Sequence, residues 1–138
     1  GTVFAISEEC SAHENFKKAF IKARARQAVG TPQYDSKLPV VAVRAIFNKG
    51  MDNFGKLQLE LLTELTSGKI TRAKAQYEIE NYWAGTLRKA VQEGDVENGS
   101  LMAGQSVGLI KDVKSINDII QDMIYDAQAE LEFVSKLF

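Results

Sequence analysis

The feature that most constrains this chain is a glycine-rich stretch at residues 94–105, Gly-Asp-Val-Glu-Asn-Gly-Ser-Leu-Met-Ala-Gly-Gln. It holds three glycines and the turn former Asn98, and small residues continue to Gly108. Glycine is favoured where φ is positive or where the backbone approaches a partner closely. The stretch therefore ends any helix before it. The residue types favour a turn between two helices, with Gly94 as the C-cap, over a ligand-binding loop.

Apolar spacing predicts helices on both sides of this stretch. Ser11 and Glu14 fit a capping box, so the first helix is expected from there to about Val29. Two further helices are expected at 56–67 and 72–93, the second capped by Thr71.

A last helix is expected from Ser115 onward, with its apolar stripe buried in its own fold. Two segments look extended instead. Residues 1–6 resemble the tail of a strand, and residues 38–48 are rich in β-branched side chains.

Composition excludes several classes of function. The chain has 138 residues, 45% hydrophobic and 25% charged, with a net charge of −1 and a pI of about 5.9. This balance gives no electrostatic case for nucleic acid or an anionic membrane as a partner. One histidine and one cysteine cannot make a zinc site or an internal disulfide, so we expect no metal and a cytoplasmic location. His13 is predicted to cap or pack, and Cys10 to be buried and inert.

The segment from Glu93 to Lys111 closely resembles one near the C-terminus of the flavin-dependent (type II) enoyl-acyl-carrier-protein reductases. These are grouped with the nitronate monooxygenases, formerly 2-nitropropane dioxygenases. The resemblance extends to Gly1-Thr2, which match the family's Met-Gly-Thr-Arg-Phe strand end, although Val3 replaces the usual arginine. The pattern around Cys10 and His13 is similar as well.

The resemblance implies a set of binding residues and no catalytic residue in this chain, because the family's catalytic histidine lies upstream of the Gly-Thr match. The family's Gly-Thr backbone holds the flavin phosphate, and its Met-Ala-Gly-Gln segment lines the substrate side of the flavin. The residues implied for the cofactor FMN are Gly1, Thr2 and Gln105. Those implied for the substrate are Ser100, Met102, Ala103 and Gly104.

The fold implied is the C-terminal portion of a (β/α)8 TIM-barrel flavoenzyme, mostly α in this chain, since a whole barrel takes on the order of 250 residues. Residues 1–30 would be the tail of the last strand and its helix, residues 31–93 a linker, an extended segment and a helical insert, and residues 94–138 the pocket loop and closing helices.

The expected function is reduction of the enoyl double bond of acyl-carrier-protein thioesters by FMN with NADH or NADPH, as in fatty-acid synthesis. The expected partners are the carrier protein, the remainder of the barrel and a second copy in a homodimer. The alternatives are an FMN-dependent nitronate monooxygenase and a non-catalytic helical interaction module. The 138-residue chain alone is predicted to be inactive.

Overall fold

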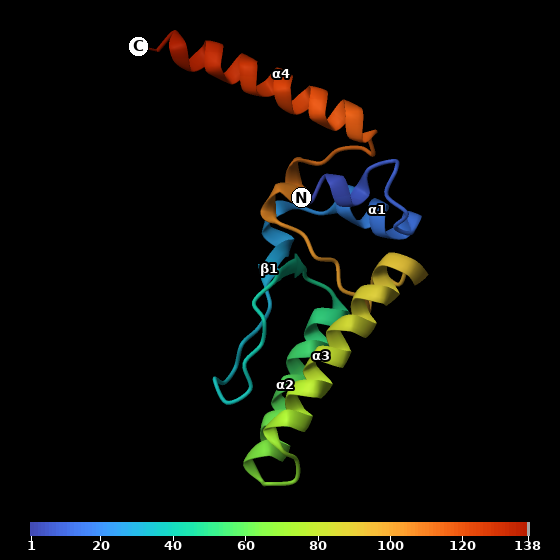
Figure 1. Ribbon diagram of the computed structural model, residues 1–138, viewed down its shortest axis with the longest axis vertical. Helices are drawn as coiled ribbons and strands as arrows, with labels where there is room; N and C mark the ends of the chain where they lie inside the picture. The colour runs from blue at the N-terminus through green and yellow to red at the C-terminus, as the bar shows by residue number, and fades with distance from the viewer. Residues whose placement is uncertain (138) are drawn as a thin grey trace.

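The computed structural model describes residues 1–137 and is mostly helical, with 58% of residues in helices and 5% in strands. Figure 1 shows a small central body with a long helical hairpin on one side and a separate C-terminal helix on the other. The elements in chain order are η1 (Phe4–Ile6), α1 (Glu14–Lys22), η2 (Ala25–Gln27), β1 (Ala28–Gly30), β2 (Arg44–Ile46), α2 (Lys49–Thr66), α3 (Arg72–Arg88), η3 (Lys89–Glu93), η4 (Gln105–Leu109) and α4 (Ile116–Ser135). Of these, η1, η2 and η4 are 3-10 helices and η3 is a π-helix.

The N-terminal region differs from its prediction at both ends. Phe4–Ile6 is a 3-10 turn, so a strand there was wrong; the amides of Ala5 and Ile6 bond back to nearby carbonyls. The first helix ends at Lys22 because Ala23 turns extended, with φ −73° and ψ 148°. The chain then runs through η2 into β1, whose hydrogen bonds go to β2 rather than to a helix.

The first helix is capped by His13 instead of Ser11. Its Nδ1 accepts a hydrogen bond from the amide of Asn15 at 3.1 Å. Its own amide donates to the carbonyl of Val91 at 2.8 Å, and the Asn15 side chain donates to the carbonyl of Gly94 at 3.3 Å. His13 therefore caps α1 and ties it to the end of η3, which confirms the predicted structural role.

The two short strands pair antiparallel, with Ala28 opposite Ile46 and Gly30 opposite Arg44. The extended segment predicted at 38–48 is thus a strand only at Arg44–Ile46. The guanidinium of Arg44 donates to the carbonyl of Ala28 at 2.7 Å, which gives this side chain a structural role.

The hairpin of α2 and α3 carries its own hydrophobic cluster. Helix α2 begins at Lys49, earlier than predicted, because Asn48 caps it by accepting from the amide of Met51. Thr71 caps α3 as predicted, with its Oγ1 3.2 Å from the amide of Lys74. Between them Gly68 has φ +74°, which a side chain would disfavour. The buried residues of this cluster are Leu38, Phe54, Leu61, Ala75 and Ile79.

A second hydrophobic cluster lies in the central body. It joins α1, the strands, η3 and the segment after the glycine-rich loop. Its largest fully buried members are Phe20, Ile6 and Val107. The rings of Phe16 and Phe20 lie 4.5 Å apart between centroids. The packing of this cluster holds the segment that follows the glycine-rich loop against the N-terminal segment.

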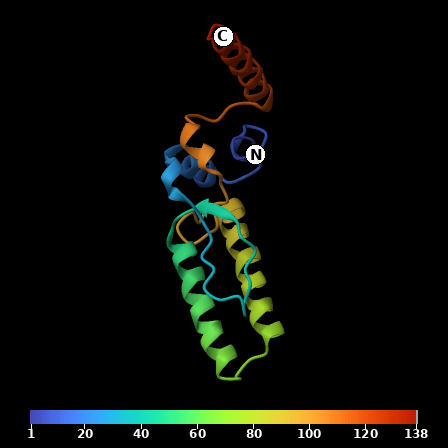
Figure 2. The ribbon, with the colours of Figure 1, turned by 90° about the vertical axis from the view of Figure 1, so that its left-hand side faces the viewer.

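Helix α4 projects from the body in both ribbon views (Figures 1 and 2). Ser115 caps it as predicted. Its only buried residue is Ile119, whereas Tyr125 and Leu131 are each 71% exposed. The prediction that α4 buries its apolar stripe within this chain was therefore wrong. Within residues 1–137, no helix combines the length and the apolar character needed to cross a membrane.

Candidate functional site

The glycine-rich stretch begins as a tight helix end. Gly94 closes η3 in the left-handed region at φ +71°, and a Cβ there would lie 2.3 Å from Nδ1 of His13. Gly94 is thus required both for its dihedral angle and for the close approach of α1. The predicted C-cap is confirmed.

A carboxylate turn continues the loop. Asp95 Oδ1 accepts from the backbone amide of Asn98 at 3.0 Å, and the Asn98 side chain donates to both Asp95 oxygens at 3.0 Å. These hydrogen bonds from Asn98, backbone first, lower the pKa of Asp95 below its ordinary value. Asp95 therefore fixes the conformation of the loop.

Asn48 fastens the loop to the hairpin. Its Nδ2 donates to the carbonyl of Val96 at 2.9 Å and to the carbonyl of Gly99 at 2.7 Å, while its Oδ1 caps α2. A Cβ on Gly50 would lie 2.3 Å from the carbonyl oxygen of Asn98, so the backbone at the start of α2 is in close contact with the loop. The loop is held on its hairpin side by these contacts.

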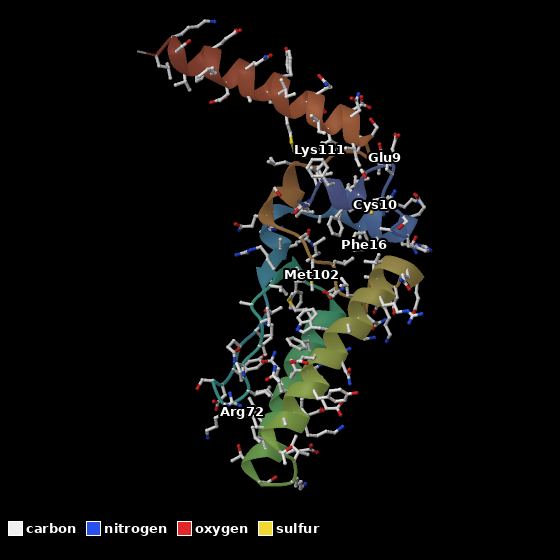
Figure 3. All side chains as sticks on the ribbon, viewed as in Figure 1. Glu9, Cys10, Phe16, Arg72, Met102 and Lys111 are labelled. Carbon is white, nitrogen blue, oxygen red and sulfur yellow. The ribbon has the colours of Figure 1, made fainter. Side chains whose placement is uncertain are left out.

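The segment after the loop extends the small sheet. Met102 forms an antiparallel β-bridge with Ala45. The amide of Ile46 donates to the carbonyl of Leu101 at 2.9 Å, and the amide of Ala103 donates to the carbonyl of Arg44 at 3.0 Å. Successive side chains on a strand point to opposite faces. Leu101 and Ala103 are buried in the body cluster, which leaves half-buried Met102 on the opposite face (Figure 3).

Gly104 meets the other end of the chain. Its amide donates to Oγ1 of Thr2 at 3.0 Å, across 102 positions of sequence. Gly1 and Thr2 line a cavity of about 500 Å3 together with Ser106, Ile110 and Lys111. Cavities that take cofactors or substrates commonly measure about 300–1,000 Å3. The structure therefore brings one predicted substrate residue, Gly104, into contact with a predicted cofactor residue, Thr2, which lines a cavity of suitable size.

The far wall of this cavity comes from the start of α4, with Ile119, Asp122, Met123 and Asp126. Lys114 Nζ lies 2.7 Å from Asp122 Oδ2, and this hydrogen bond raises the pKa of Lys114. The ammonium of Lys111 donates to the carbonyl of Gly108 at 3.4 Å, and it forms no ion pair among residues 1–137.

Ser100 lies elsewhere, on a small cavity of about 10 Å3 at the base of the hairpin. Within residues 1–137 its buried hydroxyl has no hydrogen-bond partner, and neither has the indole N–H of Trp83 on the same cavity. The Trp83 ring packs on Phe54 at 4.5 Å between centroids, so this side chain has a packing role.

The seven predicted binding residues therefore divide into two groups. Gly1 and Thr2 line the large cavity, Gly104 hydrogen-bonds to Thr2, and exposed Gln105 follows directly in sequence. The other three lie along the extended segment: Ser100 on the small cavity, Met102 against Ala45, and Ala103 in the core. Their ligand roles remain predictions.

Sequence reasoning missed the cavity residues Ser106 and Lys111. The small-residue run after Gly104 was the only sequence feature that could have indicated Ser106. Cys10 is half-buried, not buried as predicted. Within residues 1–137, no three His, Cys, Asp or Glu side chains gather closely enough to hold a metal ion.

This arrangement is similar to that of flavin-dependent (type II) enoyl-acyl-carrier-protein reductases, and the resemblance noted in the sequence is confirmed. Two solved structures are similar to this chain. One is FabK from Thermotoga maritima, at 28% sequence identity and a TM-score of 0.76, and the other is a point mutant of that FabK, at 26% sequence identity and a TM-score of 0.68. They match 98% and 100% of this chain, but only 38% and 35% of their own chains. The chain thus spans well under half the length of the solved structures it matches. No protein-family model and no curated protein matches the sequence.

The residues present offer one wall for a flavin. FabK is a flavin-dependent TIM-barrel enzyme. The cavity volume and the small side chains of Gly1, Thr2 and Ser106 suit the close approach of a large planar group. The charges around the cavity are mixed, two lysines against three aspartates, so they do not by themselves attract a phosphate. Gly1, Thr2 and Ser106 therefore fit FMN by shape more than by charge.

Proposed function

We propose that this chain is the C-terminal part of an FMN-dependent reductase that uses NADH or NADPH to saturate the enoyl double bond of acyl-carrier-protein thioesters. The observation that carries the proposal is the match to FabK over 98% of the chain at 28% identity and a TM-score of 0.76. The Gly94–Gln105 sequence, which resembles that branch most closely, adds independent support. We expect such an enzyme in the cytoplasm.

FMN, when bound, would supply hydride transfer between the nicotinamide and the thioester. Overall, the enoyl group gains a hydride at one carbon and a proton at the other, and NAD(P)H becomes NAD(P)+. Gly1, Thr2 and Gln105 would hold the cofactor side of the pocket. The hydrogen bond from Gly104 to Thr2 would keep that side in register with the substrate segment.

The substrate side would be formed by Ser100, Met102, Ala103 and Gly104. A methionine is suited to contact with an acyl chain because its thioether is polarizable and its side chain has three rotatable bonds. The pairing of Met102 with Ala45 would fix the backbone there while the side chain adapts.

The test uses the complete enzyme. Oxidation of NADH or NADPH should depend on an added trans-2-enoyl thioester, and the purified protein should carry stoichiometric FMN. Oxygen-dependent turnover of a nitronate, with no turnover of a thioester, would replace the proposal with a monooxygenase. The 138-residue chain alone should bind FMN weakly and reduce nothing, because it offers one wall of the pocket and ordering that wall around a ligand costs entropy.

A further inference from the structure

Helix α4 forms one wall of the large cavity, although it meets the body only near its first turns. Four of its residues line the cavity across from Gly1 and Thr2, namely Ile119, Asp122, Met123 and Asp126. Among residues 116–135 only Ile119 is buried, and both ribbon views show the rest of the helix projecting away from the body (Figures 1 and 2). The direction of this wall therefore depends on the contacts at the N-terminal end of α4.

A loop near the N-terminus of the chain supplies two of these contacts. The amide of Glu8 donates to the carbonyl of Lys114 at 3.0 Å. Both carboxylate oxygens of Glu9 accept from the amide of Ile116, each at 3.0 Å, across 107 positions of sequence. Figure 3 shows Glu9 beside the start of α4. Of the two links, the one from Glu8 uses only the backbone, whereas the one from Glu9 depends on its side chain.

The loop that carries Glu9 is itself anchored to α1. Lys17 is buried, and its Nζ donates to the carbonyl of Ser7 at 2.7 Å and to the carbonyl of Glu8 at 3.5 Å. A buried ammonium group needs such acceptors because it gives up its water on burial. The loop is thus fixed to the body, and a group that is bonded to Glu9 is fixed with it.

The amide of Ile116 needs a partner outside its own helix. The first four N–H groups of an α-helix have no acceptor within that helix. Ser115 accepts from the amide of Asp118 at 3.1 Å, and Glu9 accepts from the amide of Ile116. A carboxylate is favourable at this place because the N-terminal end of a helix carries partial positive charge. The Ser115 cap stays within the helix, so it is the bond to Glu9 that ties the first turn to the body.

A small tilt of α4 would change the shape of the cavity. Met123 follows Ile116 by two helical turns, which places it about 10 Å further along the helix axis. A tilt of about 10° at Ile116 would therefore move Met123 by about 2 Å. A gap of about 1 Å already forfeits up to about half of the energy of a van der Waals contact. Because Gly1 and Thr2 belong to the same N-terminal segment as Glu9, the bond from Ile116 to Glu9 sets the spacing between the two walls.

We propose that Glu9 is a positioning residue: its carboxylate binds the amide of Ile116, fixes α4 as a wall of the cavity and thereby sets the affinity of the site for FMN. This inference rests on the proposed function. Among residues 1–137, those that line the cavity do not include Glu9, so it acts through α4 and not by contact with the ligand. Since Glu9 is exposed, its effect is that of one hydrogen bond and not that of a buried charge.

Two variants of the complete enzyme remove this bond from opposite ends. Glu9→Ala removes the acceptor, and its matched control is Glu8→Ala, which loses the same charge next to it but keeps its backbone amide. Ile116→Pro removes the donor, because proline has no N–H and is well tolerated at the first position of a helix. Ser115, with φ −64° and ψ 155°, already has a backbone conformation suited to a following proline. The control Ile116→Ala shortens the same side chain and keeps the N–H.

The dissociation constant of FMN, measured by quenching of flavin fluorescence on the apo-enzyme, is the main readout. Glu9→Ala and Ile116→Pro should each weaken FMN binding about threefold to tenfold, which corresponds to one lost hydrogen bond. The two controls should bind FMN as the wild type does. The double variant Glu9→Ala/Ile116→Pro should be no weaker than either single variant, because both remove the same bond. Glu9→Gln keeps an acceptor oxygen and should recover part of the loss.

Equal FMN affinity of Glu9→Ala and Glu8→Ala would overturn the inference, and so would additive losses in the double variant. A fall of several degrees in the melting temperature of the Glu9→Ala apo-enzyme would overturn it as well, since Glu9 would then support the fold in general. A wild-type enzyme that binds no FMN would instead refute the proposed function. Deuterium uptake in residues 116–123 then decides whether Glu9 fixes α4: faster uptake in Glu9→Ala than in Glu8→Ala supports the contact, and equal uptake rules it out.

Discussion

Replacing Asn48 with alanine should destabilise the junction between the hairpin and the glycine-rich loop by more than an ordinary cap loss. Asn48 makes three hydrogen bonds: it caps α2 through Met51, and it donates to the carbonyls of Val96 and Gly99. Losing an N-cap costs about 1 kcal/mol. Each lost hydrogen bond to the loop adds about 0.5–1.5 kcal/mol. The sum for Asn48→Ala is about 2–4 kcal/mol.

Thr71→Ala provides the matched control, because the Thr71 side chain caps α3 through Lys74 and makes no further hydrogen bond in the described structure. It should cost about 1 kcal/mol. Asn48→Ser should fall between the two, since serine keeps the cap and lacks the amide donors. Urea unfolding followed by circular dichroism gives each free energy by linear extrapolation. If Asn48→Ala and Thr71→Ala cost the same, then the two loop hydrogen bonds contribute nothing and this account of the junction fails.

Three further outcomes are expected. Ser100→Ala should leave the melting temperature unchanged or raise it, because the buried hydroxyl has no partner to lose; a fall of several degrees would contradict this. The lowered pKa of Asp95 means that its contribution to stability is complete above its unfolded pKa, about 3.9, and is lost as pH falls through the folded value. Asp95→Asn should therefore flatten the pH dependence of urea unfolding in that acid range, and an unchanged profile would refute the linkage. Met102→Ala in the complete enzyme should raise KM for the enoyl thioester about tenfold with little change in melting temperature, since the side chain is half-buried; a large stability loss, about 2–5 kcal/mol, at constant kcat/KM would make it a core residue.

Local signals in the sequence predicted some ends of elements and missed others. Thr71 and Ser115 cap their helices because a hydroxyl needs only the amide three residues on, and both residues of each pair are close in sequence. Gly94 ends η3 because its positive φ is a property of one residue. Capping failed at Ser11, where His13 took the position because its amide also bonds to Val91 across the fold.

Pairing between distant segments could not be predicted from local pattern. Residues 23–29 have a helical spacing, but they form only η2 and the start of β1, because β2 offers hydrogen-bond partners 16 residues later. The contact between Thr2 and Gly104 spans 102 positions, and no periodicity indicates it. Only the family resemblance placed these two residues on one pocket, and it did so without showing Ser106 or Lys111 beside them.

Helix α4 shows where periodicity stops being informative. Its stripe of apolar residues correctly predicts a helix that presents one face for packing, but the same stripe is compatible with any partner. In this chain only Ile119 is buried, while Ile120, Met123 and Ile124 remain 44–49% exposed. A helix of 20 residues gains most of its stability from packing and not from propensity. The FabK structures that match this chain are more than twice as long as the matched part, and α4 closes the cavity that Gly1 and Thr2 line. The cavity and the uncovered stripe therefore share one helix, and exposed Met123 belongs to both.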